Sequence, residues 1–287
     1  MKIGIGLPST IPGVSGAMIR DWARLADAGP FSSLAVLDRL VYGNFDPLTT
    51  LAVVAGETRR IRLITAVLLA PLRNVGLLAK ETASLDALSN GRLTLGIGVG
   101  GREDDYHAAS VSFHDRGKRL EGQLKTLTRL WAGQPVDDQI GPVGPTPVQA
   151  GGPEILLGAY AQTAINRLER WGHGFLAAGS DAQQVGDLFG LAEAAWKRGE
   201  RSGKPRLVAD VVFALGPDAA ARATAYMLDY YAFLGPIAQY MADSVLVSEE
   251  TVKRAIQAYK KIGADELLFI PCIPELDQVR LLAGCFA

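Results

Sequence analysis

Short apolar runs alternate with amphipathic segments along the whole chain. Two of these runs, Ile61–Leu69 and Arg92–Val99, are almost wholly apolar and flank one helix-length segment, Asn74–Ser89. Runs without polar alternation are typical of strands buried on both faces, as in a parallel sheet covered by helices. The second run ends in a series of glycines: Gly96, Gly98, Gly100 and Gly101. We interpret the unit as a βαβ motif whose backbone a ligand can approach closely.

The same alternation continues on both sides of this unit. Further strands are predicted at Lys2–Leu7, Ser33–Leu37, Ile155–Leu157, Gly174–Ala178, Leu207–Leu215 and Glu266–Ile270. Helices are predicted at 17–28, 46–58, 112–131, 161–171, 181–199, 219–259 with a break at 235–236, and 276–282. Ser112–Asp115 has a capping-box pattern, 102–112 is predicted to be a polar loop, and Gln134–Gly152 an irregular excursion.

Repeated βα units of this kind limit the fold to two architectures. Eight right-handed units close most simply into one (β/α)8 TIM barrel, an α/β fold, spanning residues 1–287 as a single domain. A doubly wound open sheet is the alternative. In a TIM barrel the functional site lies in the loops after the C-terminal ends of the strands. Polar residues in those loops are therefore the candidates for function.

Composition and charge exclude several classes of partner. The chain has 287 residues, 48% apolar content and a net charge of −1, without a basic run that would attract nucleic acid or an anionic membrane. Its apolar runs are shorter than the roughly 18–20 residues of a membrane span, and no signal-peptide pattern follows Met1. The two cysteines, Cys272 and Cys285, form neither a disulfide framework nor a zinc site. We expect a cytoplasmic protein with no nucleic-acid or membrane partner.

Two glycine-containing segments are candidate ligand sites. Gly96, Gly98 and Gly101 match G-x-G-x-x-G, but they follow the fourth strand and precede a polar loop, which does not fit a Rossmann fingerprint. These glycines either let a flat ligand approach the backbone closely or only allow a tight turn, and both interpretations remain open. The segment Gly158-Ala159-Tyr160-Ala161 ends a strand and begins a helix, where free N–H groups suit a phosphate. A small-residue turn without a ligand fits that segment equally well.

The polar side chains include no obvious catalytic set. The histidines lack metal-ligand spacing, so no metal site is predicted; of them, His107 lies in the polar loop and is a weak candidate for contact with substrate. Asp38 with Asp104 or Asp105 is a conceivable carboxylate pair for a hydrolase. The plainer interpretation is an ion pair of Asp38 with Arg39 and solvated loop carboxylates. Such a site without reactive side chains suggests chemistry supplied by a bound cofactor.

The segment LAKETASLDALSNGRLTLGIGVGGREDDYHAASVSFHDRGKRLEGQLKTLTRLW resembles the signature region of the bacterial luciferase-like oxidoreductases. KIGIGLPSTIPG, TAVLLAPLRN and PEILLGAYAQTAINRLERWGHGF extend the resemblance over most of the chain. This family uses FMN or the deazaflavin coenzyme F420 on a TIM barrel. The resemblance implies an F420- or FMN-dependent oxidoreductase that transfers hydride between the cofactor and a small organic substrate, and family habit suggests a homodimer. An O2-using FMN monooxygenase, a non-catalytic flavin-binding relative and a carboxylate-based hydrolase are the alternatives.

The resemblance also implies where the cofactor binds. A non-proline cis peptide beneath the flavin ring maps to Ala66 and Val67, and the end of the fourth strand would border the ring through Gly98, Gly100 and Gly101. The phosphate would be bound by Gly158, Ala159, Tyr160 and Ala161, with Gly179 and Ser180 beside it. Where some deazaflavin enzymes have a histidine, this chain has Asp38. No acid or base is therefore assigned beyond the weak candidates Asp38 and His107.

Overall fold

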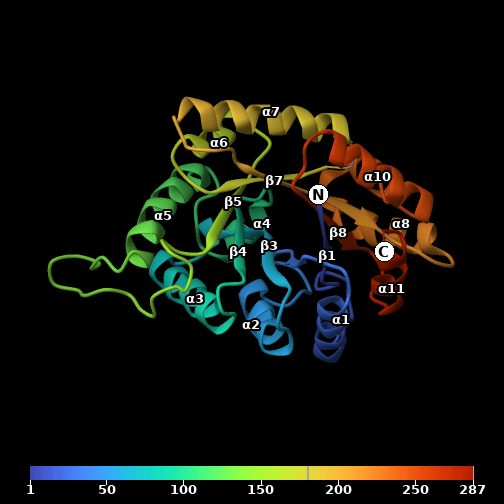
Figure 1. The fold of residues 1–287 in the computed structure, drawn as a ribbon, viewed down its shortest axis with the longest axis horizontal. Coiled ribbons are helices and arrows are strands. Elements are labelled where there is room, and N and C mark those ends of the chain that lie inside the picture. Colours follow the sequence, from blue (N-terminus) through green and yellow to red (C-terminus); the bar gives the residue numbers. More distant parts are fainter. Residues whose placement is uncertain (180, 287) are drawn as a thin grey trace.

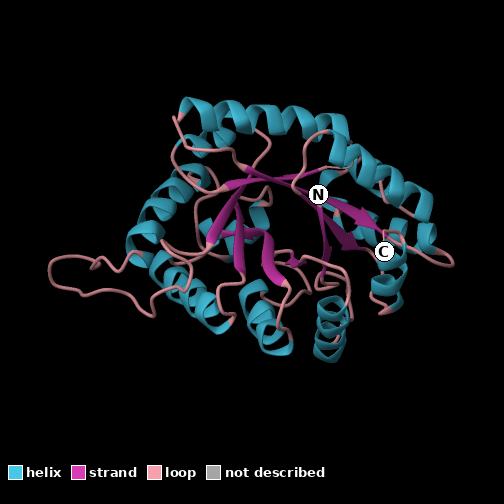
Figure 2. Cartoon of the chain, viewed as in Figure 1, coloured by secondary structure: helices cyan, strands magenta, loops and turns pink. Residues whose placement is uncertain are grey.

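The computed structural model describes residues 1–179 and 181–286, in which parallel strands form a closed barrel. Each strand pairs with its neighbours in chain order, and β1 closes the ring by pairing with β8. Figures 1 and 2 show most of the helices around the outside of this ring, with the short α4 over its centre. The strands are β1 (Lys2–Gly6), β2 (Ser33–Val36), β3 (Arg62–Leu69), β4 (Leu93–Gly98), β5 (Glu154–Gly158), β6 (Gly174–Ala178), β7 (Arg206–Phe213) and β8 (Glu266–Pro271). The predicted TIM barrel is confirmed, and the open sheet is excluded.

The helices follow the strands as the apolar pattern predicts. They are α1 (Gly16–Ala28), α2 (Pro47–Glu57), α3 (Val75–Leu88), α4 (Glu103–Ala108), α5 (Arg116–Trp131), α6 (Gln162–Ile165), α7 (Ala182–Arg198), α8 (Ala219–Tyr230), α9 (Ile237–Asp243), α10 (Glu249–Lys261) and α11 (Asp277–Gly284). Three short 3-10 helices are η1 (Ala70–Leu72), η2 (Asn166–Glu169) and η3 (Ala232–Leu234). The start of α2 is fixed by Asp46, whose carboxylate accepts from the Thr49 N–H at 2.8 Å, and Asn74 caps α3 in the same way.

Three predicted segments differ from the structure. The polar loop 102–112 contains the helix α4, whose first turn holds three acidic residues that suit a helix start. The capping box at Ser112–Asp115 does not form: α5 begins after Asp115 without a side-chain cap, and the Ser112 hydroxyl accepts only from the Asp115 N–H, at 3.4 Å. The helix predicted over 161–171 is shorter, since only α6 is α-helical and η2 continues it as a 3-10 helix.

Two of the clusters of buried apolar side chains form layers on the two sides of the barrel strands. The larger layer lies between strands and helices and contains the bulky side chains, among them Trp22, Phe175, Phe213 and Phe269. The interior of the barrel is filled by a smaller cluster that includes Ile64, Leu156, Leu176, Val208 and Leu268. Alternate residues of β7 point to these two layers, which places Asp210 between Val208 and Val212 on the inner side. An ionisable side chain therefore lies inside the barrel.

The excursion after α5 extends away from the barrel, as the green-to-yellow loop on the left of Figure 1 shows. It is irregular, as predicted, with one isolated bridge between Pro135 and Pro142. The end of this excursion is fixed by Asp86, whose carboxylate accepts from the N–H groups of Val148 and Gln149 at 2.8 and 3.0 Å. Because it connects a helix to the next strand, it lies at the N-terminal end of the barrel. It therefore does not cover the site described below.

Candidate functional site

The C-terminal end of the barrel contains a cavity of about 370 Å³. It lies over the ends of β3 to β7 and is lined largely by glycine, alanine and valine. The lining consists of Ala66, Val67, Gly98, Val99, Gly100, Gly101, Gly158, Ala159, Tyr160, Ala161, Ala164, Leu176, Ala178 and Asp210. All but two of the residues that the resemblance assigns to the cofactor are in this lining. The exceptions are Gly179, which is not in it, and Ser180, which lies outside the described residues.

The Val67 side chain occupies a slot between two glycines. A Cβ on Gly98 would lie 2.7 Å from Val67 Cγ2, and a Cβ on Gly158 would lie 2.7 Å from Val67 Cγ1. The Ala66–Val67 peptide bond is cis, as the resemblance implies, and the register of β3 against β4 shifts between Thr65 and Leu68. Gly98 and Gly158 are thus required by packing against Val67. By contrast, a Cβ on Gly101 would meet open space, so that glycine is the one that leaves room for a ligand.

The turn after β5 presents free donors to the same cavity. Among the described residues, the N–H groups of Tyr160 and Ala161 have no acceptor. The following helix α6 has only 4 residues, so its dipole is much weaker than that of the predicted helix over 161–171. The donors of the turn, more than a helix dipole, are what suit an anion here. Gly179 has a different role, because its carbonyl accepts from the Tyr259 hydroxyl and its N–H donates to the Asp210 carbonyl at 3.4 Å.

A second, smaller cavity of about 200 Å³ adjoins the first. The two cavities share six lining residues: Ala66, Val67, Gly100, Gly101, Ala178 and Asp210. The remaining wall of the smaller cavity is more polar and aromatic, with Arg39, Arg102, Tyr230, Tyr231 and Phe233 among its residues. The two cavities together can hold two ligands side by side.

The carboxylates near the second strand are already paired, in a way that corrects the sequence analysis. Asp38 pairs with Arg73 at 3.2 Å and accepts from the Leu69 N–H at 2.9 Å; it does not pair with Arg39. Burial raises the pKa of Asp38, although Arg73 and that N–H oppose the shift. Asp105 is buried, not solvated, and pairs with Arg39 at 2.9 Å. A hydrolase would need these carboxylates free to act on a substrate.

The most distinctive group of the site is Asp210, which the sequence analysis missed. Its side chain is half-buried and lines both cavities, and none of the described residues donates a hydrogen bond to its carboxylate. Burial raises the pKa of Asp210 to about 7. The signal was present in the sequence, since an acidic residue in the middle of the apolar strand LVADVVF is rarely placed inside a protein without a reason.

No histidine or cysteine of the described residues lines either of the two cavities. His107 is exposed on α4 and lines neither cavity. His173 is at the opposite end, where its Nδ1 accepts from the Ile155 N–H at 3.0 Å. Cys272 is buried, and burial raises the pKa of its thiol to about 12. Within residues 1–179 and 181–286, no group of three His, Cys, Asp or Glu side chains could share a metal ion, and no helix is long and apolar enough to cross a membrane.

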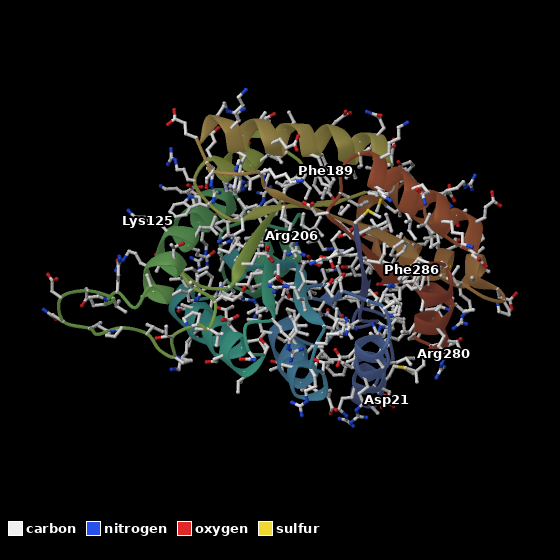
Figure 3. All side chains as sticks on the ribbon, viewed as in Figure 1. Asp21, Lys125, Phe189, Arg206, Arg280 and Phe286 are labelled. Carbon is white, nitrogen blue, oxygen red and sulfur yellow. The ribbon has the colours of Figure 1, made fainter. Side chains whose placement is uncertain are left out.

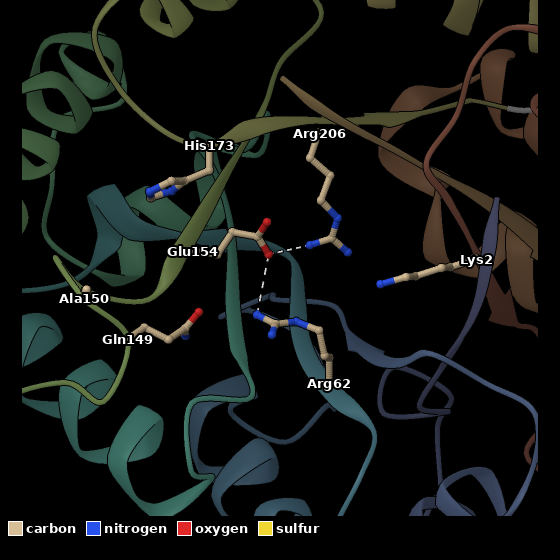
Figure 4. Close-up of a pocket in the computed structure, with 8 residues that line it drawn as sticks. Lys2, Arg62, Gln149, Ala150, Glu154, His173 and Arg206 are labelled. Carbon is tan, nitrogen blue, oxygen red and sulfur yellow. Dashed lines mark hydrogen bonds and ion pairs between the residues drawn. The ribbon is translucent and has the colours of Figure 1, made fainter. Parts of the chain in front are cut away.

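The N-terminal end of the barrel has a wider opening, of about 560 Å³, but its carboxylate Glu154 is paired with arginines (Figure 4). Glu154 is in contact with Arg206 and lies 3.6 Å from Arg62. Arg206 is also paired with Glu266, a side chain with 1% exposure. Figure 3 shows Arg206 over the centre of the ring, whereas Asp21, Lys125 and Arg280 lie on its outside. Paired charges at this end of a TIM barrel are typical of a stabilising network.

The comparisons with known proteins agree with this architecture. The family model described as luciferase-like monooxygenase matches residues 1–266. An uncharacterized protein of Mycobacterium tuberculosis is 30% identical over 171 residues, which are 57% of this chain and 60% of that protein, so the match spans less than two thirds of the relative.

Two solved structures cover the whole chain. Monooxygenase RslO1 from Streptomyces bottropensis has a TM-score of 0.81 at 23% identity, covering 100% of this chain and 98% of that one. An F420-dependent secondary alcohol dehydrogenase in complex with an F420–acetone adduct has a TM-score of 0.81 at 13% identity, with the same coverage. At these identities the two likenesses bear on the fold alone.

Proposed function

Because the chain belongs to the luciferase-like monooxygenase family, we propose that it binds F420 or FMN in the larger cavity and transfers hydride between this cofactor and a small organic substrate in the smaller one. The observation that supports this most directly is the pair of adjoining cavities at the C-terminal end of the barrel. The larger one, of about 370 Å³, is within the usual size range of cofactor sites and is lined mainly by apolar groups. F420 is our first candidate because the sequence resembles the deazaflavin-dependent members of the family slightly more than the luciferases proper.

The residues present fit such a cofactor. The backbone donors of Tyr160 and Ala161 would hold its phosphate, and Ala66, Val67 and Gly101 would face its ring. When bound, the cofactor supplies the hydride acceptor or donor, and the protein supplies orientation and a water-poor surface. This division of roles explains why the described residues of the site include no nucleophile activated by a base.

Asp210 is proposed to hold the proton that accompanies hydride transfer. A pKa of about 7 makes both forms of its carboxyl available at neutral pH, which is the condition for efficient general acid–base catalysis. The carboxylate can accept the hydroxyl proton of an alcohol, and the acid can return it to a carbonyl oxygen. No described residue competes for that carboxylate, so it is free to face the substrate.

A second candidate is an FMN-dependent monooxygenase, which the description of the family favours. The two candidates differ in their need for oxygen: hydride transfer proceeds without O2, and a monooxygenase consumes it. A carboxylate-based hydrolase is disfavoured, because Asp38 and Asp105 are held by Arg73 and Arg39. A non-catalytic binder would hold a cofactor without turning it over.

Cofactor titration tests the proposal. We expect either F420 or FMN, added to the purified protein, to change its absorbance spectrum and to saturate at one site. Turnover of the bound cofactor with alcohol and aldehyde substrates, with and without oxygen, then separates the two chemistries. If neither cofactor binds, the proposed function is wrong.

A substitution at Ala161 tests the position of the phosphate. Ala161 is the exposed N-cap of α6 in an extended conformation, which both Asp and Asn adopt readily as N-caps. Ala161→Asp places a negative charge beside the free donors, so we expect cofactor affinity to fall about tenfold or more, which corresponds to ~1.4 kcal/mol. Ala161→Asn has the same shape without the charge and should bind nearly as the wild type does. Equal affinities of the two variants would contradict the assignment.

A further inference from the structure

The smaller cavity has two guanidinium groups in its wall, and only one of them is neutralised. Arg39 has a side chain that is 5% exposed and lies 2.9 Å from Asp105 and 3.5 Å from Asp104. Arg102 forms no ion pair with any residue in the described parts of the chain, and its Nη2 donates only to the Tyr230 carbonyl. Arg102 is therefore the guanidinium of this wall that has no carboxylate within ion-pair distance among the described residues, although Asp105 and Asp104 lie near enough to act on its charge.

Arg102 is held between aromatic rings at the entrance of this cavity. Its Cζ lies 3.6 Å from the centre of the Phe233 ring and 5.1 Å from that of Tyr230. The Cζ of Arg39 lies 5.9 Å from the same Tyr230 ring, so the two cations share one aromatic neighbour. Burial and the charge of Arg39 lower the pKa of Arg102, and Tyr230, Asp105 and Asp104 oppose this shift only in part. A bound anion would relieve this repulsion and replace the water that the guanidinium has lost.

Another part of the wall of this cavity is apolar, and Asp210 also belongs to the wall. Leu37, Val212 and Ile270 line it, together with the shared residues of the larger cavity. The volume of about 200 Å³ corresponds to roughly seven water molecules, so the ligand must be small. The aromatic rings and the planar guanidinium favour a planar ligand. Two hydrogen-bond acceptors on that ligand would match the paired N–H groups of Arg102.

We infer that the smaller cavity binds a small planar organic carboxylate, whose negative group lies on Arg102 and whose reacting end lies beside Asp210. The orientation of the reacting end rests on the proposed function, since only that function makes Asp210 a proton carrier. The carboxylate subsite itself rests on the unpaired charge, the aromatic walls and the volume of the cavity.

The experiment uses benzoate and its neutral analogue benzamide as probes, with binding measured by calorimetry on the full-length protein. We expect the wild type to prefer benzoate by about tenfold or more, because a charge-assisted contact is worth at least ~1.4 kcal/mol. Arg102→Gln should abolish this preference, whereas Arg102→Lys, which keeps the charge, should retain part of it. Ala161→Asp should leave it unchanged, because that position belongs to the larger cavity.

Each outcome decides a separate question. Equal affinities for the two probes in the wild type, or no binding of either, would overturn the carboxylate subsite. If Arg102→Gln weakens the cofactor but not benzoate, Arg102 serves an anionic part of the cofactor and the inference is wrong. If neither F420 nor FMN binds the wild type while the benzoate preference and its loss in Arg102→Gln are observed, the proposed function fails and the subsite stands.

Discussion

The two ends of the barrel differ in how their charged side chains are partnered. At the N-terminal end, Arg206 lies between Glu154 and Glu266, and the Ser33 hydroxyl donates to Glu266 at 2.6 Å. At the C-terminal end, Asp210 and Arg102 have no ionic partner in the described parts of the chain. Because burying an unpaired charge costs free energy, a protein keeps such groups where they act on something else. We therefore interpret the wider opening as the structural end of the barrel, and the end with the two adjoining cavities as the place of the proposed function.

The largest expected loss of stability is that of Glu266→Gln. The Glu266 side chain is 1% exposed. Replacing its carboxylate with a neutral amide leaves Arg206 with one anionic partner, Glu154, in place of two. Breaking a buried pair in this way costs about 3 kcal/mol or more of the free energy of unfolding, measurable by urea denaturation. Glu250→Gln is the control, because the Glu250 side chain is 80% exposed and pairs with Arg254 on the surface of α10. This variant should change stability by less than about 0.5 kcal/mol. Similar values for both variants would contradict the assignment of this end as structural.

A gain in stability, and not a loss, is expected for Asp210→Asn. The pKa of Asp210 is raised from 3.8 to about 7, so between these pH values the folded protein binds more protons than the unfolded one. The free energy of unfolding of the wild type therefore falls as pH rises through this window. Asn does not titrate, so the variant does not lose this stability. We expect the variant to be more stable than the wild type at pH 8, by up to about 4 kcal/mol, and by less at pH 5.

Asp105→Asn is the matched control for this pH effect. Asp105 accepts from the N–H groups of Leu40 and Val41, at 3.1 and 2.6 Å, and pairs with Arg39. Its replacement should lower stability at both pH values. Unfolding curves that move in the same direction for the two variants would show that Asp210 is a partnered structural group.

The smallest effects are expected at two glycines of the larger cavity. In Gly98→Ala the new methyl meets Val67 Cγ2 at 2.7 Å, which should cost about 1–3 kcal/mol of stability. In Gly101→Ala the methyl meets open space, and stability should change by less than about 0.5 kcal/mol. Thermal unfolding of the two variants measures this difference. Equal losses would mean that Gly101 is also needed for packing.

Much of the fold could be predicted from local patterns. The limits of β6 are those expected, and β1, β2, β3 and β8 differ by one residue at an end. Asp46 and Asn74 cap their helices because the interaction is made within three residues of chain. The glycines after β4 and β5 stood out from the residues themselves, whereas the cis peptide between Ala66 and Val67 was found only through the family resemblance.

The sequence by itself determined the barrel, because near-continuous apolar strands must be buried on both faces and each helix shows its own apolar stripe. Only the tertiary structure decided which charges are paired. Arg39 meets Asp105 across 66 residues and Asp38 meets Arg73 across 35, while Asp210 meets no partner among the described residues. Hydrophobic periodicity is a property of neighbouring residues, whereas the pairing of charges depends on which loops the closed ring brings together.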